Sequence, residues 1–167
     1  MSNQARKSFQ QIWKFMDAGR RRQAAEVFFT TGASAGEQRV ASSLIAGRLH
    51  LRPQTAAKLP PEKLASYLSS IQSIDDLLAG AVIRSYLFTS HEPMLAMFLD
   101  ELQIQHNKGV ISAENVTPPS ADALRTATER IRSAFAAEDV ELYLAALAAS
   151  DPLTWANLNE TAPQQQV

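Results

Sequence analysis

The chain has 167 residues, no cysteine, 46% hydrophobic residues and 20% charged residues, with a formal net charge of −1. This length suits one ordinary domain, and the apolar content is enough for a core that needs no disulfide or zinc–thiolate support. The composition excludes collagen-like, disordered and membrane-spanning chains, and the missing cysteines exclude thiol chemistry. The sequence therefore predicts a soluble globular protein.

The small net charge conceals an uneven distribution of charged residues. Residues 1–58 hold ten Lys/Arg and three Asp/Glu, a balance of +7, whereas residues 59–167 hold six and fourteen, a balance of −8. The two parts either pack against each other and neutralise their charges or present opposite charges to other molecules.

No segment near the start has the pattern of a targeting signal. Five charged side chains interrupt the first twenty residues, so a secretory apolar core is absent there. The longest apolar stretch, Leu77–Ile83, is far shorter than the roughly 20 residues of a membrane-spanning helix. We expect a cytoplasmic protein, bacterial in style, with no membrane partner.

Apolar residues recur at helical spacing from the start of the chain. They predict a helix over 3–18 that ends at Gly19, where a left-handed residue would close it. A second helix over 21–29 follows so closely that the two should form an antiparallel hairpin.

Capping signals mark the later helices. Ser34 and Glu37 have the spacing of a capping box, in which each side chain satisfies a free backbone N–H. The helix that follows should turn Val40, Leu44 and Ile45 inward. Ser73, Ser90, Ser120 and Asp139 are the expected caps further along. The predicted helical segments are 34–50, a single turn within 53–59, 61–70, 74–88, 91–102, 121–137, 140–149 and a short last helix from 151.

The helical period fails from Gln103 to Pro119, which we interpret as an irregular connection. A small hairpin around Asn107-Lys108-Gly109 is the less favoured alternative, because isolated two-stranded pieces are only marginally stable. The whole pattern predicts an all-α fold, a compact bundle of about eight mostly short helices. We expect a single domain over 1–159, arranged around the helices 74–88 and 91–102, and a disordered tail over 160–167.

A run of three arginines is the most distinctive local feature. Arg21 and Arg22 stand at the positive end of the predicted second helix, where each cation costs about 0.3 to 1 kcal/mol. Solvent, the acidic part of the chain or an external anion should offset that cost. The candidate contact surface consists of Arg20, Arg21, Arg22, Arg48 and Arg52.

Candidate chemistry is sparse. The three histidines have no metal-ligand spacing, and no phosphate loop or nucleophile motif is present, so we predict no catalytic residue, no metal site and no cofactor. Long connections in compact domains are often functional, which places a candidate ligand site at Asp100, Glu101 and His106 beside the irregular segment.

We therefore expect a non-enzymatic interaction or regulatory module that binds a protein partner or self-associates. One alternative is an enzyme or small-ligand binder with its site beside residues 100–111. The other is a nucleic-acid-binding regulator that uses the N-terminal basic patch, which is less favoured because the aromatic residues there suit the core better than base stacking.

Overall fold

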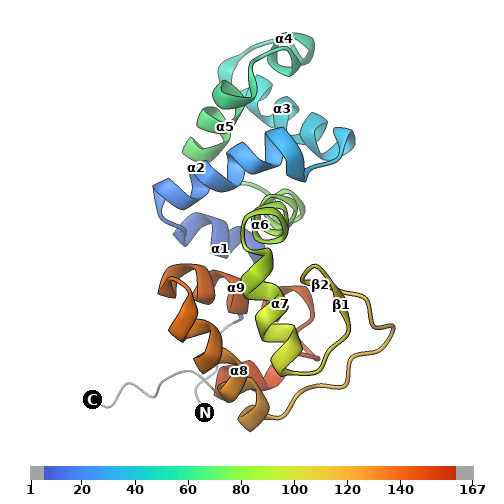
Figure 1. The fold of residues 1–167 in the computed structure, drawn as a ribbon. Helices are drawn as coiled ribbons and strands as arrows, with labels where there is room; N and C mark the ends of the chain where they lie inside the picture. Colours follow the sequence, from blue (N-terminus) through green and yellow to red (C-terminus); the bar gives the residue numbers. More distant parts are fainter. Residues whose placement is uncertain (1–5, 161–167) are drawn as a thin grey trace, which may run out of the picture. The chain divides into compact units, whose positions relative to one another are not determined.

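The computed structural model describes residues 6–160, and over this range the chain is almost entirely helical (Figure 1). Nine α-helices, one π-helical turn, one 3₁₀ turn and one small hairpin lie within the described residues, which confirms the all-α class. Within the same range no helix combines the length and apolar character needed to cross a membrane. The predicted tail falls outside the described residues except for Glu160.

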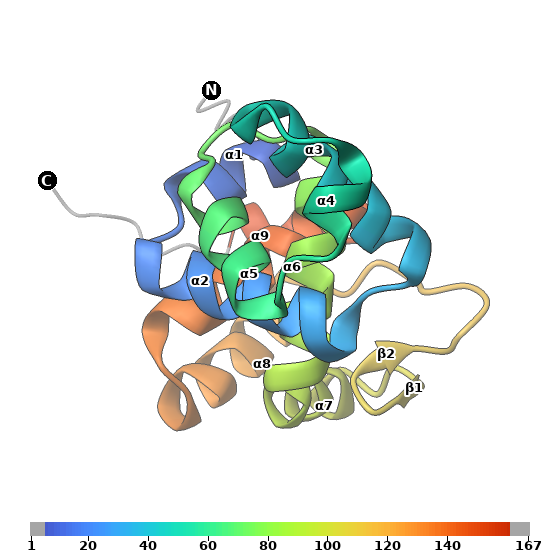
Figure 2. The same cartoon turned by 90° about the horizontal axis from the view of Figure 1, so that it is seen from above.

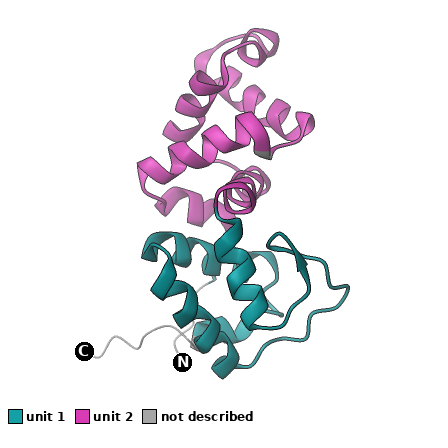
Figure 3. Ribbon diagram, in the orientation of Figure 1, with its two compact units in different colours: residues 1–7, 91–167 teal, residues 8–90 magenta. Residues whose placement is uncertain are grey.

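The chain divides into two compact units (Figure 3). The first, here the N-terminal unit, is Ser8–Ser90; the second, here the C-terminal unit, comprises the chain from His91 onward together with the residues before Ser8. The N-terminal unit holds α1 (Phe9–Phe15), α2 (Ala18–Val27), η1 (Phe28–Gly32), α3 (Ala35–Leu49), α4 (Pro53–Ala57), α5 (Pro61–Ser70) and α6 (Asp76–Ser90). The C-terminal unit holds α7 (Glu92–Glu101), β1 (His106–Asn107), β2 (Val110–Ile111), α8 (Ala121–Ala134), α9 (Ala137–Ser150) and η2 (Ala156–Glu160).

Helix α6 is the scaffold of the N-terminal unit, as its apolar sequence predicts. Helices α1, α2 and α3 and the turn η1 all pack on it, and α5 packs against α2. Trp13 of α1 is fully buried, and its indole Nε1 donates a hydrogen bond of 2.8 Å to the carbonyl of Ile71. Burial of such a large ring with its one polar atom satisfied makes it an anchor for α1.

The first two helices differ from the prediction. Ser8 and Gln11 form a capping box that starts α1 at Phe9, and the carboxylate of Asp17 caps a new helix directly after it. Gly19 therefore lies inside α2 rather than ending a helix. The predicted antiparallel hairpin is also wrong, because α1 packs on α6 and α2 packs on α5 and α6 instead of on each other.

Several expected positions along the later helices need correction as well. In α3 the small-residue face with Ala41 and Ala46 is buried, so that Val40 is 55% exposed. Asp75, not Ser73, caps the start of α6 by accepting the N–H of Leu78 at 2.9 Å. Helices α7 and α9 begin after His91 and Ala136 rather than after Ser90 and Asp139.

The core of the C-terminal unit is built around one aromatic cluster. Phe98 of α7 meets the ring of Tyr143 edge to face at 5.3 Å and lies 6.1 Å from the ring of Trp155, measured between ring centroids. All three side chains are buried. Burial raises the pKa of the Tyr143 hydroxyl above its ordinary value, because the charged phenolate would lose its hydration.

The segment after α7 forms the small hairpin that the sequence analysis gives as the less favoured alternative, because isolated two-stranded pieces are only marginally stable. Strands β1 and β2 pair antiparallel with Asn107 opposite Val110, and the two turn residues Lys108 and Gly109 both have positive φ, 51° and 83°, which is typical of a tight type I′ turn. The hairpin is not isolated, since it lies beside α7 (Figure 2). Within the predicted irregular segment, residues 103–105 before the hairpin and the connection from 112 to 120 after it lie outside helices and strands.

Replacement of Gly109 and of Gly47 by alanine should change the free energy of unfolding in opposite directions. At Gly109 a Cβ would lie 2.7 Å from the Cβ of Leu95 and would also meet a positive φ, so Gly109→Ala should lower the free energy of unfolding by about 1–3 kcal/mol. At Gly47 in α3 a Cβ would meet nothing within 4 Å, so Gly47→Ala should raise it by about 0.5–1 kcal/mol. Urea unfolding followed by circular dichroism measures both, and equal effects of the two substitutions would contradict the close approach of the hairpin to α7.

Candidate functional site

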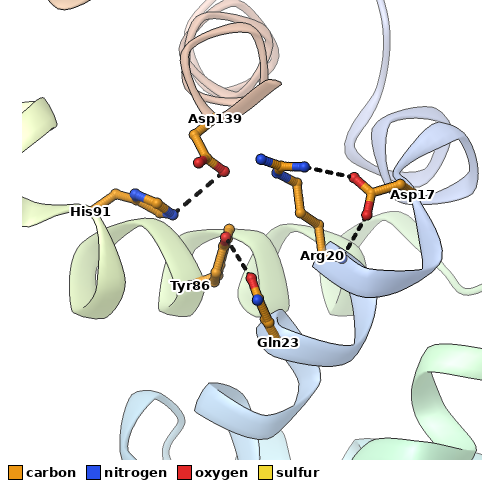
Figure 4. A network of polar contacts seen from close by, with 6 residues as sticks. All are labelled: Asp17, Arg20, Gln23, Tyr86, His91 and Asp139. Atoms are coloured by element: carbon orange, nitrogen blue, oxygen red, sulfur yellow. Dashed lines mark hydrogen bonds and ion pairs between the residues drawn. The ribbon is translucent and has the colours of Figure 1, made fainter. Parts of the chain in front are cut away.

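The carboxylate of Asp17 organises the start of the arginine run (Figure 4). Its Oδ1 accepts the backbone N–H of Arg20 at 2.9 Å, and its Oδ2 lies 3.1 Å from the guanidinium of the same residue. The backbone hydrogen bond chiefly, together with the side-chain bond and charge of Arg20, holds the pKa of Asp17 below its ordinary value. The negative charge sits at the positive end of α2, where it offsets the cost predicted for the arginines.

The other two arginines of the run are also engaged within the N-terminal unit. Arg21 is buried, and its guanidinium donates a hydrogen bond of 3.3 Å to the carbonyl of Lys14, in the last turn of α1. That end of a helix carries partial negative charge, so the cation is favoured there. Arg22 pairs with Glu26 one turn further along α2 at 2.8 Å. Local partners therefore contribute to the offset for the arginine run.

Arg48 and Arg52 lie in a different part of the N-terminal unit. Arg48 is in the last turn of α3, and Arg52 is the residue before α4, which packs against α3. Both views place α4 away from the start of α2 (Figures 1 and 2). The five arginines of the candidate contact surface consequently form two separate groups.

The residues from Arg48 to Arg52 form a short exposed segment, here the 48–52 segment. Its sequence is Arg-Leu-His-Leu-Arg, and all five residues are exposed. His50 adopts the left-handed conformation with φ of 53°, and the N–H of Leu51 bonds back to the carbonyl of Ala46 at 2.9 Å. This helix ending leaves Leu49 and Leu51 each 37% exposed between the two arginines.

The charges of the 48–52 segment have no local partner. Within residues 6–160, no carboxylate forms an ion pair with Arg48 or Arg52. The sequence from 38 to 61 holds four Lys/Arg and no Asp/Glu. The segment therefore combines apolar side chains with uncompensated positive charge.

The candidate ligand site divides into two contacts within the C-terminal unit. The Nε2 of His106 lies 2.8 Å from the Oδ1 of Asp100, at the end of α7. Glu101 points elsewhere, and its Oε2 lies 3.1 Å from the guanidinium of Arg130 on α8. The structure thus brings Asp100 and His106 together, as the candidate site requires, but fastens Glu101 to a neighbouring helix.

The ring of His106 is held on both nitrogens. Its Nδ1 accepts the backbone N–H of Gly109 at 3.1 Å, so this nitrogen carries no proton and Nε2 must be the donor to Asp100. His106 is mostly buried, whereas the Asp100 side chain is 74% exposed. The histidine therefore ties the turn of the hairpin to the end of α7 and orients the carboxylate of Asp100.

A second histidine–carboxylate contact was not anticipated from the sequence. The Nε2 of His91, the residue before α7, lies 3.5 Å from the Oδ1 of Asp139 in the first turn of α9 (Figure 4). Both side chains are largely buried. The two residues stand far apart in the chain, and no spacing rule relates them, so local patterns hold no signal for this pair.

Neither histidine–carboxylate contact belongs to a larger cluster of potential metal ligands among the described residues. Among the described residues, no group of three or more His, Asp or Glu side chains is arranged to hold a metal ion. Comparison of the chain with models of protein families, with curated proteins and with solved structures finds no match. Function must therefore be inferred from the surfaces themselves.

Asp17 predicts a pH dependence of stability. Because its folded-state pKa is depressed, its contribution is present above the unfolded value of about 3.9 and is lost as the pH falls through the folded pKa. Asp17→Asn keeps a capping oxygen at every pH but removes the titrating charge. Urea unfolding at about pH 6 and about pH 2.5 should show a smaller loss of stability on acidification for the variant than for the natural chain. An equal loss would contradict the capping role of the carboxylate.

The two contacts of His106 predict a structural role. His106→Phe should lower the free energy of unfolding by about 1–2 kcal/mol, because it removes both hydrogen bonds and leaves the Gly109 N–H without its partner. Asp100→Asn is the matched control and should cost less, since its amide oxygen still accepts the imidazole proton. Urea unfolding of both variants tests the difference, and equal costs would contradict the role of the Gly109 contact.

Proposed function

We propose that this chain is a non-enzymatic interaction module and that the 48–52 segment is its principal binding surface for an acidic protein partner. The observation that carries the proposal is the pairing of two exposed leucines with two exposed arginines that have no carboxylate partner in the described part of the chain. Arginine is enriched at protein interfaces and at their energetic hot spots, and the buried centre of an interface is more apolar than the rest of the surface.

The shape of the segment also suits binding. The left-handed residue His50 and the backbone bond from Leu51 to Ala46 fix the end of α3, and Pro53 opens α4 at once. The leucines and arginines therefore project from a backbone held at both sides. A surface that is ordered before binding loses less conformational entropy when a partner docks.

The two alternatives receive less support. The ring nitrogens of His106 are both used in contacts that fasten the hairpin, so neither of them is free to act as a base in catalysis. The nucleic-acid alternative relied on a broad basic patch, but Arg20 and Arg22 are paired with carboxylates and Arg21 is buried. A pair of exposed arginines is a small footprint for binding phosphates.

A defined peptide tests the proposal. The probe is a fluorescein-labelled helical peptide with leucine on one face and glutamate on the other, and the same peptide with lysine for glutamate is the negative probe. The full chain should bind the glutamate peptide in fluorescence anisotropy, and Arg48→Glu/Arg52→Glu should weaken that binding about tenfold or more. Salt should weaken it as well, because the contacts are exposed.

Lys14→Glu/Lys63→Glu is the matched control, since it makes the same change of net charge at two exposed lysines outside α3 and α4. It should bind the glutamate peptide like the natural chain. Equal loss in both double variants would show a general charge effect and overturn the proposed surface. Salt-sensitive binding of a labelled DNA duplex with no binding of the peptide would favour the nucleic-acid alternative instead.

A further inference from the structure

We propose that the partner of the 48–52 segment is a second copy of this chain, which it contacts at the exposed end of α7 and the adjoining hairpin. This inference rests on the proposed function and names the partner that binds the 48–52 segment. The contacting surface, here the Asp100 surface, is the exposed carboxylate of Asp100 at the end of α7 in the C-terminal unit. Charge complementarity and an ordered carboxylate carry the argument.

The two units of one chain carry opposite charge. Residues 8–90 hold ten Lys/Arg and six Asp/Glu, a balance of +4, whereas residues 91–160 hold four and eleven, a balance of −7. Two copies therefore attract each other when the N-terminal unit of one meets the C-terminal unit of the other. Complementary potentials of this kind favour one pairing and disfavour contact between like units.

Asp100 is suited to receive an arginine. Its Oδ1 is held by His106, and the ring of His106 is held in turn by the N–H of Gly109, so the carboxylate is already oriented. The side chain remains 74% exposed, which leaves its second oxygen accessible. An arginine that binds a carboxylate fixed in this way gains a charge-assisted hydrogen bond at a small cost in side-chain entropy.

Each copy carries both surfaces, so the contact joins unlike faces. Such a contact either closes into a dimer through two equal contacts or continues along a chain of copies. Both outcomes show as a weight-average mass that rises above 18.3 kDa with concentration. Sedimentation equilibrium of the full chain measures this mass directly.

The first experiment compares concentration and salt. At about 50 mM NaCl the mass of the natural chain should rise between roughly 10 and 500 µM protein, and about 500 mM NaCl should reverse most of the rise. Arg48→Glu/Arg52→Glu and Asp100→Lys should each weaken self-association about tenfold or more, whereas Lys14→Glu/Lys63→Glu should not. A natural chain that stays at 18.3 kDa throughout would overturn the inference.

Complementation is the decisive experiment. Arg48→Glu/Arg52→Glu retains the Asp100 surface, and Asp100→Lys retains the 48–52 segment, so an equimolar mixture should recover a complex that neither variant forms alone. Asp100→Asn serves as a second variant of the Asp100 surface because it removes the charge while its amide oxygen still accepts the proton of His106. Circular dichroism confirms that each variant is folded. Failure of both mixtures would overturn the pairing.

The outcomes separate this inference from the function on which it rests. If the natural chain is monomeric but binds the glutamate peptide through Arg48 and Arg52, the interaction module stands and the second copy is wrong. If it neither self-associates nor binds the peptide, both proposals fail. If it self-associates equally in every variant, the 48–52 segment is not the contact.

Discussion

The hydrogen bond between the Asp17 carboxylate and the backbone N–H of Arg20 fixes where α2 begins, and the packing of α2 in the N-terminal unit depends on that start. It starts α2 immediately after α1, so the two helices diverge onto α6 instead of folding back on each other. With α2 starting there, Arg20 pairs with Asp17, and the buried Arg21 donates to a carbonyl in the last turn of α1. Arg22 pairs with Glu26. All three arginines of the most conspicuous basic run in the sequence thus make contacts within the N-terminal unit.

That result moves attention to charges that the fold does not use. Arg48 and Arg52 belong to no run of charges in the sequence, yet they are exposed and without a carboxylate partner in residues 6–160. In the C-terminal unit, Asp100 is bound on one oxygen only, and its orientation depends on a histidine fixed by the turn of the hairpin. Our proposals thus place stability and binding on different members of the same candidate sets.

Local signals in the sequence located most elements. The Ser34 cap, the helix 61–70 and the Ser120 cap all agree with prediction, because each depends on residues a few positions apart.

Contacts between distant segments cannot be predicted from such local signals. The spacing of apolar residues in α3 fits two faces equally well, and only packing shows that Ala41 is buried and Val40 exposed. The hairpin was disfavoured because its contact with Leu95 could not be foreseen. Of the candidate ligand site, the sequence indicated the Asp100–His106 neighbourhood, but not that Glu101 pairs with Arg130.

The division at Ser90 has a consequence for the order of events during synthesis. The N-terminal unit is continuous in sequence, and it leaves the ribosome before the C-terminal unit has been made. At about 5–20 residues per second, the ribosome needs several more seconds to make the following 70 or so residues. During that interval a nascent chain displays arginines and leucines but not yet the acidic unit. Neighbouring ribosomes on one message would then carry chains at different stages, a setting in which a finished copy can meet an unfinished one.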